Sequence, residues 1–230
     1  NSLVGSEMCI RDRWKSPLVV GAVSAGVLVL GAIVLSELTA QRVIHVRADD
    51  SSDSAASYAA VRQAHCQASV PHYKPGDTAI AFSFADRPVT TQNISISNTL
   101  ALLGACKNTQ NPISNKQPGT SLMLLLERIQ SAVQKQRVRH NLNPVVVTIT
   151  IQDAEPGPNQ PQLDLDKVKE LVNGIIGDRG VVAFIVEDEN LQSQLDMKLA
   201  EDGNVEVCSF QDVKQCVDFA FDMGRKPEGQ

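Results

Sequence analysis

Residues 145–151 read VVVTITI, and this run constrains the fold more than any other part of the sequence. Its apolar side chains would lie on both faces of a strand, which is typical of a central parallel strand that is covered on both sides. Strand-like and helical patterns alternate before and after it. The expected strands are 42–48, 78–84, 92–97, 145–151, 181–186 and 205–210, and the expected helices are 54–68, 99–106, 121–137, 165–176, 191–200 and 212–222.

This order of elements predicts an α/β fold with a doubly wound, mostly parallel sheet, because alternating strands and helices of this length are joined by right-handed crossovers. The turn residues 86–88 separate the second and third strands, so we expect a hairpin and one antiparallel strand. The face of the helix at 54–68 that is expected to pack on the sheet comprises Ala56, Ala60, Val61 and Ala64.

An uncharged apolar segment, residues 17–36, is long enough to cross a bilayer as one helix. We predict a membrane span here; a cleaved signal peptide is the alternative, although its apolar region is usually shorter. Residues 1–13 resemble translated adaptor sequence and are set aside as a suspected non-native leader. Lys15 then favours a cytoplasmic N-terminus, which places the domain outside the cytoplasmic membrane of a bacterium, in the periplasm or on the cell surface. The remaining parts are the folded domain, 42–222, and a tail, 223–230.

The formal net charge of -5 argues against a nucleic-acid partner, because neutralising phosphates requires clustered Lys and Arg. The domain also carries an even number of cysteines. Two disulfides in an oxidising compartment would account for them, and buried free thiols would do so equally well. The pairing cannot be deduced from the spacing. These cysteines are Cys66, Cys106, Cys208 and Cys216, and the fifth, Cys9, lies in the leader.

Oxygen-bearing side chains stand at the expected ends of two strands and before one helix. The string DSSDS at 50–54 follows the first strand, Thr120 precedes the helix at 121–137, and Asp153 follows the strand at 145–151. Because the carboxyl ends of parallel strands meet at one edge of a sheet, these side chains are expected to lie together. Carboxylate and hydroxyl oxygens are the ligands that Mg²⁺ and Mn²⁺ prefer. The sequence therefore predicts a divalent-cation site at Asp50, Ser52, Ser54, Thr120 and Asp153.

With this motif and order of elements, residues 42–222 resemble the von Willebrand factor A (vWA) domain. Its metal-ion-dependent adhesion site (MIDAS) combines a DxSxS motif with a Thr and an Asp farther along the chain. The resemblance implies that Ser52, Ser54 and Thr120 offer hydroxyl oxygens to a Mg²⁺ or Mn²⁺ ion, and that Asp50 and Asp153 neutralise it, partly through water. It also implies an open coordination position for an Asp or Glu carboxylate of a protein partner.

The sequence departs from the family pattern at two places. The family usually has Gly where Asp53 stands, and it reads TDG where this chain has Gln152-Asp153-Ala154. Asp53 would either add negative charge to the site or face solvent. The Asp/Ser run is also compatible with ordinary helix N-capping. Asp49 could be mistaken for the first ligand, but the serine spacing then fails.

These features predict a membrane-anchored, metal-dependent protein-binding module, for adhesion or complex assembly, rather than an enzyme. A metal-independent structural subunit of a membrane complex with the same fold is the first alternative. The second is a metal-dependent hydrolase in which Glu155 acts as the base. The histidines are isolated in sequence, and a strand histidine such as His45 is more often packed or hydrogen bonded than catalytic.

Overall fold

The computed structural model describes residues 41–97, 106, 119–139, 143–158, 160–199 and 201–226. Six strands form one sheet in the order β3-β2-β1-β4-β5-β6. They are β1 (Ile44–Asp50), β2 (Thr78–Phe84), β3 (Val89–Ser95), β4 (Val145–Ile151), β5 (Gly180–Val186) and β6 (Val205–Ser209). Only the β2–β3 pair is antiparallel among them, so the predicted mixed sheet with one antiparallel strand is confirmed. The predicted leader and membrane span, and most of the expected helix at 99–106, lie outside the described residues.

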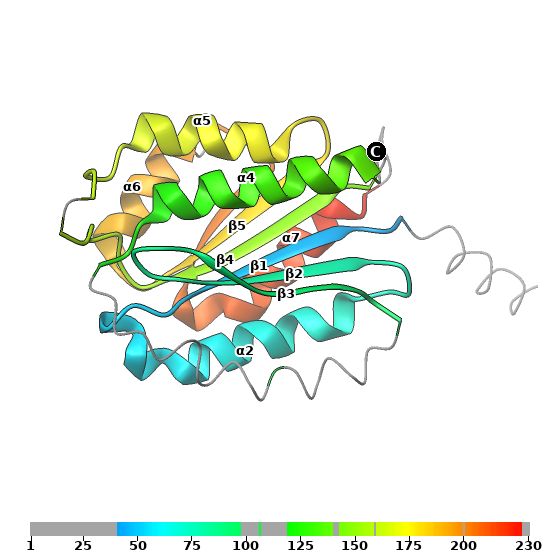
Figure 1. The fold of residues 1–230 in the computed structure, drawn as a ribbon, viewed down its shortest axis with the longest axis horizontal. Helices are drawn as coiled ribbons and strands as arrows, with labels where there is room; N and C mark the ends of the chain where they lie inside the picture. The colour runs from blue at the N-terminus through cyan, green and yellow to red at the C-terminus, as the bar shows by residue number, and fades with distance from the viewer. Residues whose placement is uncertain are drawn as a thin grey trace, which may run out of the picture. The chain divides into compact units, whose positions relative to one another are not determined.

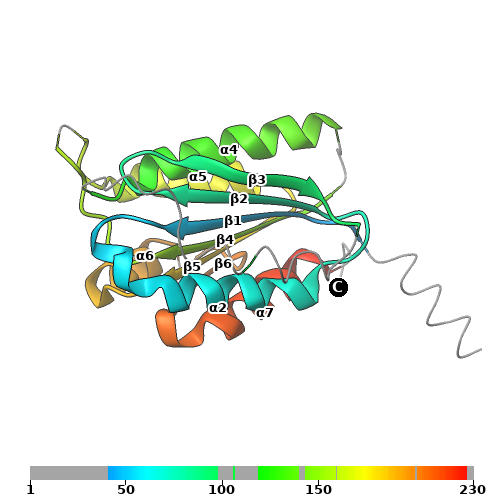
Figure 2. The ribbon, with the colours of Figure 1, turned by 60° about the horizontal axis from the view of Figure 1, so that its bottom comes forward.

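Helices cover both faces of the sheet (Figures 1 and 2). One face carries α4, α5 and α6, and the other carries α2 and α7. The helices are α2 (Ala59–Ser69), α4 (Leu122–Arg139), α5 (Leu165–Ile176), α6 (Glu189–Leu199) and α7 (Val213–Gly224), with 3₁₀ turns η1 (Ser54–Tyr58), η2 (Val70–His72) and η4 (Phe210–Asp212). Within the described part of the chain, no helix is both long and apolar enough to cross a bilayer.

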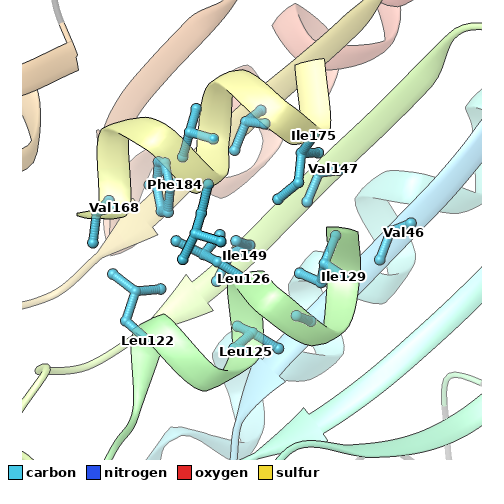
Figure 3. Packing of buried hydrophobic residues seen from close by; sticks show 14 of the residues in the cluster. Val46, Leu122, Leu125, Leu126, Ile129, Val147, Ile149, Val168, Ile175 and Phe184 are labelled. Atoms are coloured by element: carbon cyan, nitrogen blue, oxygen red, sulfur yellow. The ribbon is translucent and has the colours of Figure 1, made fainter. Parts of the chain in front are cut away.

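Strand β4 has apolar side chains on both faces of the sheet, so helices must cover both faces. Its side chains alternate, so that Val147 and Ile149 pack under α4 and α5, while Val146 packs under α7. Figure 3 shows Leu126 and Ile129 of α4 against these strand residues. The apolar stripe of α4 and the buried run of β4 therefore position the start of α4 beside the end of β4.

Strand β1 is Ile44–Asp50 rather than the predicted 42–48. The two acidic residues were expected to end the strand, but Asp49 aligns with Thr150 of β4 and Asp50 with Phe84 of β2. Both carboxylates are buried and find hydrogen-bond donors there, so the ladder continues through them. Strand β3 is likewise Val89–Ser95 rather than 92–97.

The packed face of α2 differs from the prediction. Ala60 and Ala64 are exposed and Val61 is only half-buried, whereas the buried side chains lie mainly on a polar stripe. That stripe consists of Arg62, His65, Cys66 and Ser69. These residues recur at i, i+3, i+4 and i+7 and so form one face, but each needs a specific partner to be buried. Periodicity of apolar residues could not reveal those partners.

The cysteines form two disulfides, Cys66–Cys106 and Cys208–Cys216, with Cα–Cα distances of 5.5 Å and 6.1 Å. The first ties α2 to the segment that follows β3. The second ties β6 to α7. The structure therefore has disulfides rather than free thiols, and it shows which cysteines are paired.

Candidate metal site

The predicted donors gather at the carboxyl edge of the sheet, on the left of Figure 1, where β1 and β4 end and α4 begins. Asp50 is the last residue of β1, and Asp153 follows the end of β4. Thr120 immediately precedes the N-terminal turn of α4. The doubly wound topology therefore places all three segments at the edge where such folds bind ligands.

Four of the five donors are linked by hydrogen bonds. The hydroxyl oxygens of Ser52 and Ser54 lie 3.1 Å apart, and the Ser54 hydroxyl donates to Oδ2 of Asp153 at 3.2 Å. Asp50 accepts from the N–H groups of Ser52 at 2.9 Å and Gln152 at 3.1 Å. These bonds connect the loop after β1 directly to the loop after β4.

The Asp50 carboxylate is 3 % exposed. Burial raises its pKa to about 6, and the negative charge of Asp153 acts in the same direction, while the N–H groups of Ser52 and Gln152 oppose the shift. Burial of this carboxylate carries a desolvation penalty, which the charge of Arg62 offsets in part and a bound cation would offset further. The environment of Asp50 is therefore suited to a positively charged ligand.

Thr120 is held by its backbone, and its hydroxyl has no partner. Its N–H donates to the carbonyl of Glu155 at 2.6 Å, which joins the start of α4 to the loop that carries Asp153. Its side chain is 1 % exposed, and Oγ1 makes no hydrogen bond within the described ranges. Buried hydroxyls are nearly always hydrogen bonded, so this unpartnered oxygen is available to coordinate a bound ion.

The turn before Thr120 depends on Gly119. Its φ angle of +90° favours glycine, and a Cβ at this position would overlap the backbone of Gly157 in the loop after β4. Gly119 thus lets two loops approach closely enough for the Thr120–Glu155 hydrogen bond.

We expect Gly119→Ala to lower the free energy of unfolding by more than about 1 kcal/mol and to weaken metal binding, because Thr120 would be displaced. Gly203→Ala is the matched control, since a Cβ there would meet no atom within 4 Å. Urea unfolding and metal titration of both variants would check this. Equal stability of the two variants would contradict it.

Three other acidic residues near the site have different roles. Asp53 is exposed and faces solvent. The side chain of Glu155 is also exposed, and this residue contributes to the site through its backbone, whose N–H donates to Oδ1 of Asp153 at 3.1 Å. Asp49 is buried and binds His65 and Thr150, at 2.7 Å and 3.0 Å.

Sequence reasoning missed Arg62. This α2 residue is 4 % exposed, and its Nη1 donates to the carbonyls of Asp50 at 3.2 Å and Ala55 at 2.7 Å. The Arg62 side chain therefore links the start of the DxSxS loop to the residue that follows it, from the side of α2. A charged residue in this helix was visible in the sequence, but the distant carbonyl groups that it binds were not.

The donor set fits a hard divalent cation better than a softer one. The set has two carboxylates and three hydroxyls. Among the described residues, no three His, Cys, Asp or Glu side chains are placed to hold a metal, so a site here would depend on the hydroxyl oxygens. Oxygen-only sets with few charges suit Mg²⁺ or Mn²⁺, which retain water ligands. The unpartnered Thr120 hydroxyl and the buried Asp50 carboxylate are both consistent with this class of ion.

No protein-family model and no curated protein matches the chain. Several solved structures do, at low identity. Proximal thread matrix protein 1 from the mussel byssus is 11% identical with a TM-score of 0.54, over 80% of this chain and 48% of that one. A von Willebrand factor type A protein from Catenulispora acidiphila is 13% identical with a TM-score of 0.52, over 81% and 43%.

An aerotolerance-related membrane protein from Bacteroides fragilis is 11% identical with a TM-score of 0.56, over 78% of this chain and 98% of that one. A further structure of the mussel protein, 10% identical with a TM-score of 0.54, has a zinc-occupied MIDAS motif. The chain spans about half the length of the mussel protein. Together with the sheet order and the helices on both faces, these likenesses show that the chain has the vWA fold.

Proposed function

We propose that this chain is a membrane-anchored protein-binding module, and not an enzyme, that holds Mg²⁺ or Mn²⁺ in a MIDAS-type site. Asp50, Ser52, Ser54, Thr120 and Asp153 would hold the ion. The observation that carries the proposal is the buried Thr120 hydroxyl without a partner, beside the linked Ser and Asp side chains. The zinc-occupied MIDAS of the mussel protein supports a divalent cation at this place in the fold.

The bound ion would supply an electrophilic coordination position for an Asp or Glu carboxylate of a protein partner. Residues 17–36 would anchor the domain in the membrane. The two disulfides support an oxidising compartment outside the cytoplasm. The partner is therefore expected to be an extracytoplasmic protein with an accessible acidic side chain.

We expect Asp50→Ala and Thr120→Ala each to weaken Mg²⁺ and Mn²⁺ binding at least about tenfold. The first removes a buried charge and the second removes the unpartnered hydroxyl. Calorimetric titration of the full chain in detergent would measure both. Asp53→Ala is the matched control, because Asp53 lies within the same motif but is exposed. Absence of binding by the wild type at millimolar metal would contradict the proposal.

A metal-independent structural subunit is the second candidate, favoured by the Ser52–Ser54–Asp153 hydrogen bonds, which link the two loops without an ion. Co-purification of partner proteins with and without a chelator distinguishes the two. Loss of the partner on chelation, and its loss in Asp50→Ala but not in Asp53→Ala, is expected for the metal-dependent module. Retention in every case would indicate the structural subunit.

A further inference from the structure

A second candidate site lies between α4 and the β2–β3 hairpin. Here a hollow of about 230 Å³ opens beside β3, which is an edge strand of the sheet. Figure 2 shows α4 running alongside this hairpin. Ile80 and Phe82 of β2 line the apolar part of the hollow. None of the five metal donors lines it, so the hollow is separate from the site described above.

Two cations border the hollow without acidic partners. Arg128 and Lys135 lie on the same face of α4, seven residues apart, which corresponds to about 10 Å along a helix. Neither forms an ion pair with any residue that the structure describes. No Asp or Glu is among the lining residues. Both side chains are exposed, so solvent rather than a protein carboxylate balances the positive charge at the hollow.

Gln136 adds an amide that faces the hollow. Its side chain is 8 % exposed and lines the hollow, yet it forms no hydrogen bond with any described residue. Its amide atoms are not among the fully buried, unpartnered atoms of the described residues, so water in the hollow reaches them and a ligand oxygen could take the place of that water. Thr90, Asn93 and Ser131 add further hydrogen-bonding groups around the hollow. Every polar group that lines it can donate a hydrogen bond.

We propose that this hollow binds a small molecule with two acidic oxygen groups, such as a dicarboxylate or a phosphate ester that also bears a carboxylate. Its anionic groups would bind Arg128 and Lys135, and the Gln136 amide would donate to an oxygen near Lys135. The short carbon chain of the molecule would lie against Ala132, because Ile80 and Phe82 are only 2 % and 1 % exposed. The size of the hollow suits a small metabolite rather than a drug-sized ligand. The inference does not depend on the metal site.

Calorimetric titration of the full chain in metal-depleted buffer, at constant ionic strength, would test the proposal. The probes are glutarate and 3-phosphoglycerate. Saturable binding of at least one, with a Kd on the order of 1 mM or tighter, is expected. Preference for glutarate identifies a dicarboxylate as the ligand class, and preference for 3-phosphoglycerate identifies a phosphate ester. Binding of neither probe at about ten times that concentration overturns the proposal.

The double variant Arg128→Gln/Lys135→Gln should weaken binding at least about tenfold. Its matched control is Lys74→Gln/Lys226→Gln, which changes the net charge equally at exposed positions outside this hollow. Gln136→Met should also weaken binding without a change in charge. Equal weakening in the control would show non-specific attraction and overturn the proposal. Asp50→Ala should leave probe binding unchanged, so this test and the metal test can fail separately.

Discussion

Replacing Asp49 by Ala is expected to lower the free energy of unfolding by about 3 kcal/mol or more, because it would leave a buried cation and buried donors without their acceptor. Asp49 accepts from Thr150 and pairs with His65 at 2.7 Å. Arg47 Nε lies 3.0 Å from its Oδ2, although its N–H does not point at that oxygen, so this contact is ionic. Urea unfolding followed by circular dichroism would measure the loss.

The network extends beyond Asp49. His65 contacts Thr148 at 2.7 Å, and Thr148 contacts His45 at 2.9 Å, so α2, β1 and β4 are joined by one buried polar chain. His45 is hydrogen bonded in turn to Tyr73 at 2.6 Å. It is thus a packed, hydrogen-bonded histidine, as the sequence suggested. Removing Asp49 would therefore break its pair with His65 and also weaken the packing of α2 against the sheet.

The loss should depend on pH. Burial alone would raise the pKa of Asp49, but the charge of Arg47 and the contact with His65 lower it to about 2. A lowered pKa in the folded state means that this stabilisation is complete above the ordinary pKa of about 3.9. It is lost as the pH falls through about 2, so the wild type and the variant should converge there.

Asp53→Ala is the control for stability, since Asp53 is exposed and its removal should change the free energy of unfolding by less than about 0.5 kcal/mol. A difference below about 1 kcal/mol between Asp49→Ala and the wild type would contradict the buried network. The metal affinity of folded Asp49→Ala should fall less than that of Asp50→Ala, because Asp49 binds His65 and Thr150 rather than the metal donors.

Removing the Cys66–Cys106 disulfide should cost about 4 kcal/mol, and removing Cys208–Cys216 about 2.5 kcal/mol. The difference follows from loop closure in the unfolded chain, since the two bridges join cysteines 40 and 8 residues apart. The measurement is urea unfolding of two double Ala variants under oxidising conditions.

Each double variant is the control for the other, because all four cysteines are buried and each pair loses the same atoms. The reverse order of stability, or equal losses, would contradict the loop-closure account. A loss of stability on adding a reductant to the wild type, and no such effect in a variant that lacks both bridges, would confirm that both disulfides form.

The sequence by itself determined the sheet and the positions of most of its elements. The bounds of β2, β4 and α5 agree with the prediction because strong apolar patterns and flanking Pro, Gly or Asp residues define them locally. The expected position of the donors followed from topology, since parallel strands present their carboxyl ends at one edge. Their roles as metal ligands remain a prediction.

Only the tertiary structure decided which polar residues are buried. Arg62, His65 and Asp49 look like surface residues in the sequence, because burial of a polar group depends on partners that are distant along the chain. The same reason applies to the disulfide pairing and to the gathering of Arg128, Lys135 and Gln136 around one hollow. Local patterns specify strands and helices, whereas polar complementarity exists only after the elements have packed together.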